Sequence, residues 1–440
     1  MKKKETVFIG LMLFSMFFGA GNLIFPPFLG MEAGTSFWLA ITGFIVTGVG
    51  LPFVVLASMS LVKGGAQALG SRVHPLFGSV FTVIVYLSIG PFLAIPRNAN
   101  VAYEMGLKPF VGGSSLNNSV LLLLFSFVFF GLVYMVSLNP SKLVDYMGRW
   151  ITPTLLLAIV VLCVTAFIHL SAPLHAPAES YQSGAFFKGF IEGYSTMDAL
   201  AALAFGVVIL NTFRQRGVKD NQQLMQYTLK AGFVAGLALA FVYVAVGLVG
   251  AKMASQGTFE NGTAILSATA SSFLGFGGKL LLGVIFSLAC FTTCVGLTTA
   301  CGQFFAQISS KFSYKFFVTA VTIVSFALAN LGLNEIITVS VPFLVMAYPL
   351  TIVLITLSFF TKAHKVYGSA ILLTGLVALF DGLKAFGLQL KQMQSFMDML
   401  PFSSFGLGWI VPALVGTLMG YIWDKFSRKT IPADDEQKAS

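Results

Sequence analysis

The sequence predicts an all-α membrane protein with about twelve transmembrane helices. Of its 440 residues, 57% are hydrophobic and only 10% are charged, whereas soluble domains carry about 25% charged residues. The apolar runs reach the length of about 20 residues that a helix needs to cross roughly 30 Å of hydrocarbon. These runs are continuous rather than short and alternating, so a transmembrane β-barrel is not expected.

Hydropathy places the spans in order along the chain, with an apolar run for each. The first run follows three lysines, yet its length and the aromatic and proline residues after it indicate a retained helix rather than a signal peptide. The twelve expected spans are 6–29, 36–61, 75–99, 117–137, 150–170, 186–211, 228–251, 280–308, 315–333, 336–360, 367–389 and 404–424.

The basic residues predict the orientation of the spans. With the N-terminus in the cytoplasm, 19 of the 26 Lys and Arg residues fall on the cytoplasmic side, as the positive-inside rule requires. We therefore expect a multi-pass protein of the cell membrane with both termini cytoplasmic. The net charge of +10 then needs no nucleic acid partner. All four cysteines lie inside apolar runs, which indicates buried thiols rather than a disulfide framework or a transition-metal site.

Span 1 carries an interruption near its centre, at Gly19–Asn22, followed by Pro26-Pro27. Lipid offers no hydrogen-bond partners, so a broken helix persists only where it lines a cavity or a binding site. The inner half ends around Ser15 to Phe18 with free carbonyl groups, and the outer half begins near Gly21 with free N–H groups. Carbonyls attract a cation, and amides attract an anion such as a carboxylate. The break predicts a two-ended site for a small ligand; the alternative is a proline-kinked helix without a ligand.

Span 6 is interrupted in the same way at Gly193–Asp198. Five spans separate the starts of the two interrupted helices, so the second half enters the membrane from the opposite side, the pattern of an inverted-repeat transporter. We expect a first repeat at 1–170, a second repeat at 186–360, two further helices within 367–424 and a cytoplasmic tail at 425–440. In the last helix Gly416 and Gly420 form a small-xxx-small pair that predicts close helix packing.

Asp198 is a carboxylate flanked by apolar sequence at membrane depth. A charge there costs at least about 3 kcal/mol unless it is paired, which makes the residue a functional candidate. Three such roles stay open: binding a substrate ammonium, helping to bind a cation, and relaying a proton. A structural role as the cap of the second half of span 6 fits its position equally well.

Span 8 offers a second set of oxygen atoms. Thr292 and Thr293 are adjacent, and the carbonyl of Ala289 lies one turn earlier. Such oxygens suit a hard cation such as Na⁺, although buried threonines often bond back to carbonyls of their own helix.

Four polar residues mark the outer end of span 3. They can shape an outer vestibule, but ordinary solvation at the membrane interface is the preferred interpretation. They are Arg97, Asn98, Asn100 and Glu104. Elsewhere the sequence shows no nucleophile–base pair, phosphate-binding loop, redox motif or metal-ligand cluster, so an enzyme is not expected.

Residues 18–27 (FGAGNLIFPP) and 193–206 (GYSTMDALAALAFG) resemble the bacterial branched-chain amino acid:cation symporters of the BrnQ type, and the likeness extends over essentially the whole chain. That family is similar to the wider LeuT-fold group of the APC superfamily, which implies a LeuT-like 5+5 inverted repeat with discontinuous helices 1 and 6 and two extra C-terminal helices. In that fold a Gly-x-Gly-Asn break holds the substrate carboxylate. Carbonyls before the break and an Ala-x-x-Thr-Ser/Thr pattern on span 8 hold Na⁺. An acid at position 198 belongs to the family likeness and not to the wider fold.

The resemblance implies which residues contact the ligands. The implied substrate contacts are Gly19, Ala20, Gly21, Asn22, Tyr194, Ser195, Thr196 and Asp198, and the implied cation ligands are Ser15, Phe18, Ala289, Thr292 and Thr293. An apolar lining for an aliphatic side chain is expected from Tyr86, Leu200, Leu203, Cys294 and Leu297. Burying a Leu, Ile or Val side chain there contributes about 1.5–3 kcal/mol.

The expected function is import of leucine, isoleucine and valine by symport with Na⁺ through alternating access. Coupling to H⁺ with Asp198 as the proton carrier and an uncoupled channel or facilitator for small zwitterions are the alternatives. No cofactor is expected beyond the coupling ion. The expected partners are the amino acid and the lipid bilayer, with no nucleic acid and with the oligomeric state left open.

Overall fold

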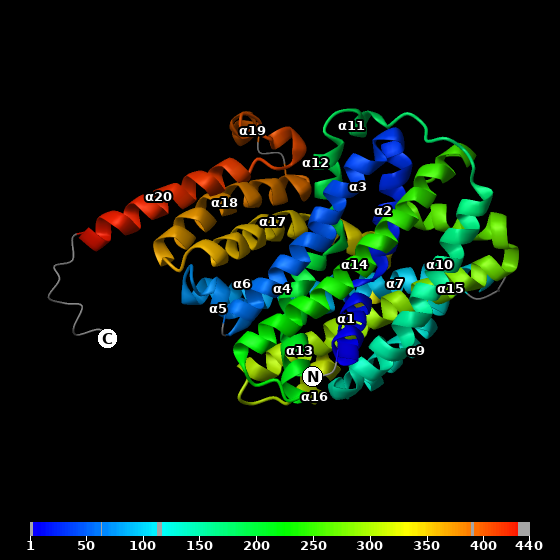
Figure 1. The fold of residues 1–440 in the computed structure, drawn as a ribbon, viewed down its shortest axis with the longest axis horizontal. Helices are drawn as coiled ribbons and strands as arrows, with labels where there is room; N and C mark the ends of the chain where they lie inside the picture. Colours follow the sequence, from blue (N-terminus) through cyan, green and yellow to red (C-terminus); the bar gives the residue numbers. More distant parts are fainter. Residues whose placement is uncertain (1–2, 63, 112–116, 389–390, 430–440) are drawn as a thin grey trace. The chain divides into compact units, whose positions relative to one another are not determined.

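The fold is described from a computed structural model, which describes residues 3–62, 64–111, 117–388 and 391–429. All regular elements in these residues are helical (Figure 1). Eight of the described helices are long and apolar enough to cross a membrane, or nine if one bent pair counts as a span. The all-helical membrane class is confirmed, and the number of twelve spans stays a prediction.

The chain divides into two compact units, and the first contains both interrupted helices. This unit comprises 1–61 and 86–340. Its main helices are α1 (Lys3–Phe17), α2 (Ala20–Ala33), α3 (Phe37–Ile45), α4 (Leu51–Leu61), α7 (Ala94–Gly106), α9 (Asn118–Ser137), α10 (Thr152–His169), α12 (Ala185–Glu192), α13 (Asp198–Gln215), α14 (Asn221–Met253), α15 (Gly262–Ile308) and α16 (Tyr314–Ala329).

Both expected interruptions are present in this unit. In the first, α1 ends at Phe17 and α2 begins at Ala20, so the backbone leaves the helix at Phe18 and Gly19. In the second, a 3₁₀ turn at Gly193–Thr196 separates α12 from α13, and the two helices are bent by 44°. Met197 follows that turn with φ 67°. The left-handed region costs a residue with a side chain of the order of 1–3 kcal/mol, a strain that proteins tend to keep at functional sites.

Span 3 differs from the expectation of one continuous helix over 75–99. A π-helical turn at Ser88–Phe92 joins α6 (Pro75–Leu87) to α7, and Gly90 has φ −90° and ψ −119°. Pro91 has no N–H to donate, and Gly90 has no Cβ to restrict its backbone, so the helix bends between them. The helix then continues to Gly106, which places its C-terminal end seven residues later than the expected end at residue 99.

The half-helix α2 is held tightly against α14. Gly30 faces Gly247, and a Cβ at Gly250 would overlap the carbonyl of Pro27. Glycines therefore let the two backbones approach closely, as small residues do in membrane helix pairs. On the other side a Cβ at Gly262 of α15 would overlap the carbonyl of Ile24. These contacts fix the position of α2, and with it the position of the first break.

The second unit comprises 62–85 and 341–440. Its helices are α5 (Gly65–Gly70), most of α6, the larger part of α17 (Leu333–Phe360), α18 (His364–Ala385), α19 (Lys391–Asp398) and α20 (Ile410–Lys429). A Cβ at Gly416 of α20 would lie 2.6 Å from the carbonyl oxygen of Ser369, and one at Gly420 would lie 2.6 Å from Cα of Val366. The predicted close packing through this glycine pair is confirmed.

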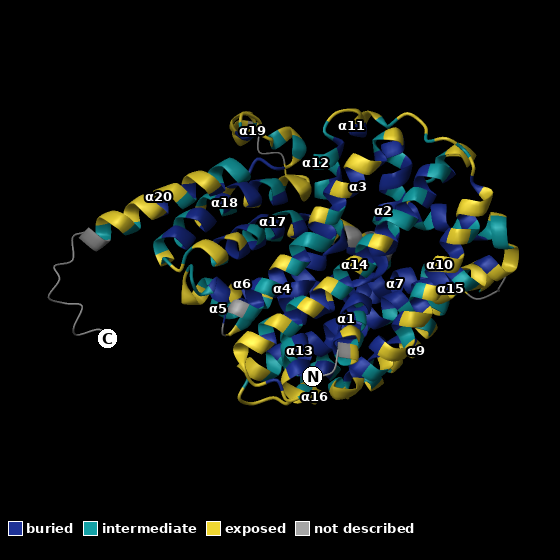
Figure 2. Ribbon diagram, viewed as in Figure 1, coloured by how far each residue is buried: buried dark blue, intermediate teal, exposed yellow. Residues whose placement is uncertain are grey.

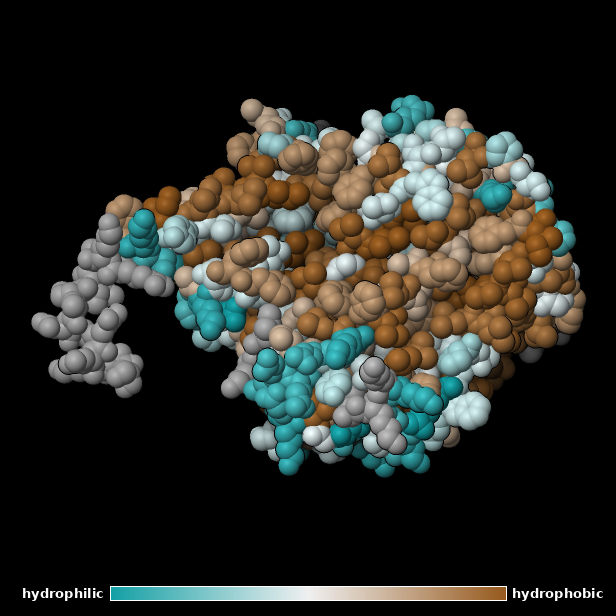
Figure 3. Space-filling model, viewed as in Figure 1, coloured by the Kyte–Doolittle hydropathy of each residue, from teal (hydrophilic) through white to brown (hydrophobic). Residues whose placement is uncertain are grey.

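Large apolar side chains remain exposed along several helices of the first unit, whereas the helices around the breaks are buried (Figure 2). On α9 and α10 the exposed set includes Leu124, Phe127, Val128, Leu132, Met135, Leu157 and Ile168. Figure 3 shows hydrophobic residues over much of the visible face and hydrophilic residues gathered beside the N-terminus. An exposed apolar belt of this kind matches a lipid environment.

Candidate functional site

The two breaks and the kinked span 3 meet at a small cavity of about 20 Å³. A cavity of this size has room for about one water molecule. Its walls come from α1, α2, the π-helical turn at Ser88–Phe92, α7, the second break with α13, and α15. The lining residues are Met16, Phe17, Gly19, Ala20, Gly21, Asn22, Ile89, Ala94, Arg97, Asn98, Thr196, Met197, Asp198, Ala201, Thr293 and Leu297.

The expected cation ligands of α1 and α15 lie together on one side of the first break. The hydroxyl of Thr292 donates to the carbonyl of Ser15 at 2.8 Å and lies 3.0 Å from the carbonyls of Leu288 and Ala289. Thr292 therefore contacts carbonyls of its own helix, as back-bonded threonines do, and also the carbonyl of Ser15 just before the first break. Carbonyl and hydroxyl oxygens gathered in this way form a set that a hard cation can bind.

Thr293 and Phe18 complete this side of the break. The Thr293 hydroxyl is buried and has no hydrogen-bond partner among the described residues, and it lies 2.9 Å from the place of a Cβ at Gly19. Phe18 is fully buried with its ring stacked on Phe14. An unsatisfied buried hydroxyl calls for an explanation, and a ligand that binds beside Gly19 would supply the missing partner.

The amides at the start of α2 are partly occupied by side chains of the protein itself. The N–H of Gly19 donates to Oδ1 of Asn22 at 3.1 Å, and the N–H of Ala20 donates to Oδ1 of Asn98 at 2.8 Å. Asn98 is held in turn by its amide nitrogen, which donates to the carbonyl of Ala94. The sequence predicts free N–H groups here that face a carboxylate. Two of them, on Gly19 and Ala20, already donate to side chains of α2 and α7.

Asp198 connects the two breaks. Its Oδ2 accepts hydrogen bonds from Nδ2 of Asn22 at 2.6 Å and from the hydroxyl of Tyr243 at 3.0 Å, and Asn22 also contacts the Tyr243 hydroxyl. All three side chains are buried. Met197, not Asp198, occupies the N-cap position of α13, without a side-chain cap bond. Asp198 is the first residue of that helix, where the helix dipole also favours a negative charge.

Of the three other residues expected to contact the substrate at the second break, only one lines the cavity. Thr196 lines the cavity, and its hydroxyl donates to the carbonyl of Gly193 at 2.9 Å. Tyr194 and Ser195 are not among the lining residues; the Tyr194 ring packs on Phe190, and Ser195 contributes its carbonyl to a contact with α7. Both residues lie in the 3₁₀ turn at Gly193–Thr196, which the sequence does not reveal.

The apolar lining also differs from the expectation. Leu297 lines the cavity as expected, whereas Tyr86, Leu200, Leu203 and Cys294 do not. The apolar walls come instead from residues beside the breaks and on either side of the kink in span 3. They are Met16, Phe17, Ile89, Ala94, Met197 and Ala201.

Arg97 lies inside the site, which corrects the preferred interpretation of interfacial solvation. Its side chain is only 6% exposed, and Nη1 donates to the carbonyl of Ser195 at 3.4 Å. Nη2 lies 3.1 Å from the place of a Cβ at Gly21. An arginine inside an apolar run is itself a signal of function. The sequence shows this signal only if span 3 is taken to extend to Gly106, because Arg97 then lies inside the span.

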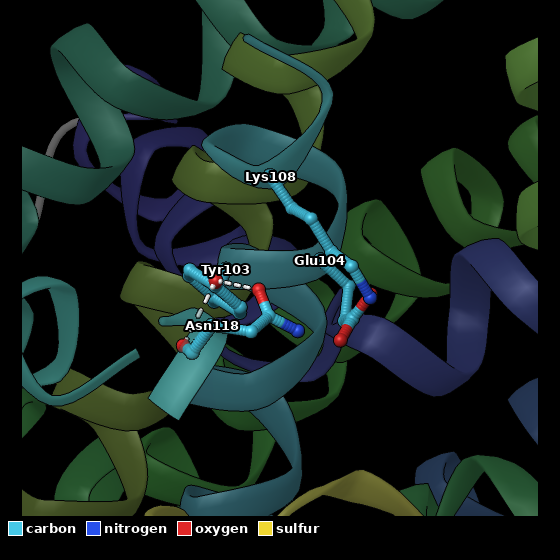
Figure 4. Close-up of polar contacts among 4 residues, drawn as sticks. All are labelled: Tyr103, Glu104, Lys108 and Asn118. Atoms are coloured by element: carbon cyan, nitrogen blue, oxygen red, sulfur yellow. Dashed lines mark hydrogen bonds and ion pairs between the residues drawn. The ribbon is translucent and has the colours of Figure 1, made fainter. Parts of the chain in front are cut away.

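A separate polar group lies at and just after the C-terminal end of α7 (Figure 4). Lys108 pairs with Glu104 at 2.6 Å, and the hydroxyl of Tyr103 donates to Oδ1 of Asn118 at 2.6 Å. Glu104 and Lys108 line an open cavity of about 540 Å³. The other residues that line this cavity are Val101, Met105, Asn261, Thr263, Leu331, Gly332 and Glu335.

Asn100 does not line this cavity. Its side-chain amide donates to the carbonyl of Ala329 at 2.7 Å and so serves packing.

Comparison with known proteins gives matches over nearly the full chain. Residues 2–427 match the model of a family described as branched-chain amino acid transport protein. The chain is 44% identical to the branched-chain amino acid permease BraB of Bacillus subtilis (strain 168) over 429 residues, 96% of each protein. It is 37% identical to the branched-chain amino acid permease BrnQ of Escherichia coli (strain K12) over 436 residues, 98% of each protein.

Two solved structures share the architecture at low sequence identity. One is Mhp1, a nucleobase-cation-symport-1 family transporter in a closed conformation with bromovinylhydantoin bound. It has a TM-score of 0.66 and 13% identity, and the match covers 97% of this chain and 93% of that one. The other is MhsT in complex with L-phenylalanine, with a TM-score of 0.55 and 16% identity over 94% and 98% of the two chains. These likenesses confirm the LeuT-type fold and say nothing further about ligands.

Proposed function

We propose that this chain, a member of the branched-chain amino acid transport protein family, imports leucine, isoleucine and valine across the cell membrane together with Na⁺. The family and its permease relatives are transporters, so the chain is a transport protein and not an enzyme. The substrates are suggested by the names of relatives at 37–44% identity. The coupling ion is our proposal.

One observation carries the proposal: oxygen atoms suited to a cation and groups suited to an amino acid share the first break. The Ser15 carbonyl with Thr292 and Thr293 lies before and beside the break, and Asn22 with Asp198 lies after it. A cation bound on the first side therefore stabilises the conformation of the break that the substrate contacts on the other. Coupling through a shared structural element is what symport requires.

The proposed substrate contacts are the eight residues implied by the family resemblance, with different roles for different members. Gly19, Ala20, Gly21, Asn22, Thr196 and Asp198 line the cavity directly, while Tyr194 and Ser195 shape the turn that holds them. The proposed Na⁺ ligands are Ser15, Phe18, Ala289, Thr292 and Thr293.

The cavity of about 20 Å³ is too small for a leucine, since it holds about one water molecule. The helices around it must therefore separate to admit the substrate and close again around it. In the proposed cycle Na⁺ favours the outward-open conformation, substrate binding permits closure, and release follows on the cytoplasmic side.

The proposed topology has twelve spans, with repeats at 1–170 and 186–360 and with both termini in the cytoplasm.

Leucine uptake into proteoliposomes tests the proposal. An inward Na⁺ gradient, an inward H⁺ gradient and no gradient are imposed on the same preparation, and internal leucine is followed with time. We expect accumulation above equilibrium only with Na⁺. Accumulation driven equally by H⁺ alone would replace Na⁺ by a proton route through Asp198, and equilibration without accumulation would indicate a facilitator.

A variant of the cation side sharpens this test. Thr292→Ala removes a hydroxyl that contacts the carbonyls of Ser15 and Ala289 and should raise the half-saturating Na⁺ concentration about tenfold, the effect of losing about 1.4 kcal/mol. Thr292→Ser keeps the hydroxyl and should stay close to wild type. Thr298→Ala is the matched control, because Thr298 is buried on the same helix but does not line the cavity. An unchanged Na⁺ dependence of Thr292→Ala would remove this residue from the cation site.

A further inference from the structure

The cavity between the breaks is lined by one basic and one acidic side chain. Arg97 from α7 and Asp198 from α13 both line it, and both side chains are almost fully buried. Buried charges are costly unless they are compensated, so they are rare in membrane helices and mark sites of function. An amino acid zwitterion also carries two opposite charges, which makes the pair a complement to the substrate's two ends.

Two backbone amides at this break already have acceptors within the protein. Those of Gly19 and Ala20 already donate to Asn22 and Asn98. A carboxylate that enters the site meets these two amides already engaged, so a further donor in the cavity wall would strengthen its binding. The side chain of Arg97 lines the same cavity, and its guanidinium carries five N–H groups and no acceptor.

Gly21 leaves the approach to Arg97 open. A Cβ there would lie 3.1 Å from Nη2 of Arg97 and 3.2 Å from Cα of Thr196. Because glycine has no Cβ, the guanidinium lies directly beside the backbone at the start of α2. The flat, forked guanidinium matches the geometry of a carboxylate with two parallel hydrogen bonds, which an ammonium cannot reproduce.

Asp198 is suited to the other end of the ligand. Its Oδ2 accepts hydrogen bonds from Asn22 and Tyr243. These donors fix the carboxylate in the cavity wall, where it can attract a substrate ammonium. The kink at Gly90 and Pro91 directs α7 toward the breaks and so brings Arg97 within reach of the same ligand.

We propose that Arg97 binds the carboxylate of the substrate and thereby restricts this transporter to amino acids with a free carboxylate. This inference rests on the proposed function and assigns a specificity-determining residue within the same site. Arg97 then acts on the ligand directly and is more than a counter-ion that neutralises Asp198.

Equilibrium binding to the purified full-length protein in saturating Na⁺ tests the inference. Leucine is compared with leucinamide, which keeps the side chain and the ammonium but has no carboxylate. Wild type should bind leucine at least thirtyfold more tightly than leucinamide. Arg97→Gln should weaken leucine binding about 10- to 100-fold and leave leucinamide binding unchanged or improved, so that the preference largely disappears.

Further variants separate recognition from structure. Arg97→Lys keeps the charge but loses the fork, and an intermediate loss for leucine is expected. The double variant Arg97→Gln/Asp198→Asn should not recover leucine binding. Arg72→Gln, which removes an arginine that hydrogen-bonds Tyr367 in the second unit, is the control and should bind both ligands as wild type does.

Each outcome has a distinct meaning. Wild type that does not bind leucine at all contradicts the proposed function itself. Wild type that binds leucine while Arg97→Gln retains both the affinity and the preference overturns the role of Arg97. Equal weakening of leucine and leucinamide in Arg97→Gln, with recovery in the double variant, would show that Arg97 serves only as a counter-ion of Asp198.

Discussion

Gly19→Ala is the substitution whose effect follows most directly from the geometry of the first break. The added Cβ would lie 2.7 Å from Oδ1 of Asn98 and 2.9 Å from the hydroxyl of Thr293, whereas ordinary contacts begin near 3.4 Å. Both neighbours would have to retreat by about half an ångström or more. Oδ1 of Asn98 is the acceptor for the N–H of Ala20, so this retreat also stretches the bond that joins α7 to the start of α2.

Overpacking of this kind costs about 1–3 kcal/mol. Asn98 and Thr293 both line the cavity, so we expect this cost to fall on the closed, leucine-bound conformation. Since each 1.4 kcal/mol is a factor of ten in an equilibrium constant, leucine affinity should fall about 5- to 150-fold. The assay is equilibrium binding of radiolabelled leucine to purified protein in saturating Na⁺, with the melting temperature measured on the same sample. Melting temperature reports whether the variant is folded, so that a loss of affinity is assigned to the site.

Gly131→Ala provides the matched control. Gly131 lies inside helix α9, and a Cβ there meets no atom within 4 Å. It should bind leucine as wild type does and melt at the same or a slightly higher temperature, because alanine is the better helix former. A Gly19→Ala protein that binds leucine within twofold of wild type would refute the close approach at the break.

Three other substitutions test separate parts of the structure. Tyr243→Phe removes a donor to Asp198 and should weaken leucine binding about tenfold, since a hydrogen bond to a charged group contributes about 1.5–3 kcal/mol; an unchanged affinity would remove this bond from the site. Asp198→Asn keeps the shape of the side chain but not its charge, and uptake should be lost without a large change in melting temperature; normal uptake would leave the residue a structural role. Gly416→Val inserts a side chain 2.6 Å from the carbonyl of Ser369 and should lower the melting temperature by several degrees, whereas Gly368→Ala, which meets nothing within 4 Å, should not.

The two breaks could be predicted from the sequence because glycine, asparagine and proline are unfavourable inside a lipid-exposed helix. The structure interrupts the first helix at Phe18 and Gly19 and the second at Gly193–Met197, within a few residues of the expected positions. The contact between Ser15 and Thr292 was also expected, but only through the family resemblance, because nothing local in span 8 separates a cation ligand from a back-bonded threonine.

The sequence predicts Arg97 at the membrane interface, whereas the structure buries it in the cavity wall. The hydropathy of span 3 falls where polar residues begin, so the expected end at residue 99 put the arginine at the membrane interface. The helix in fact continues to Gly106, and the kink at Gly90 brings the polar stretch into the cavity. A change of a few residues in a helix boundary thus converts a solvated arginine into a buried one.

Tyr243 could not have been found from the sequence. It lies in an apolar run of α14 with no polar neighbour to mark it, and its role appears only because α14 packs against α2 and brings its hydroxyl to Asp198. The same holds for Tyr194 and Ser195, whose side-chain directions depend on the 3₁₀ turn at Gly193–Thr196. Contacts of this kind are set by tertiary packing and leave no local pattern.

The central claim is that a cation and an amino acid bind to opposite sides of one break and stabilise each other. It is tested most directly by measuring the leucine dissociation constant over a series of Na⁺ concentrations at constant ionic strength, with choline as the replacement. The half-saturating Na⁺ concentration is then measured over a series of leucine concentrations. Thermodynamic linkage requires the same factor in both directions, and we expect Na⁺ to tighten leucine binding at least tenfold and leucine to tighten Na⁺ binding equally. Leucine binding of equal affinity in Na⁺ and in choline would contradict the account.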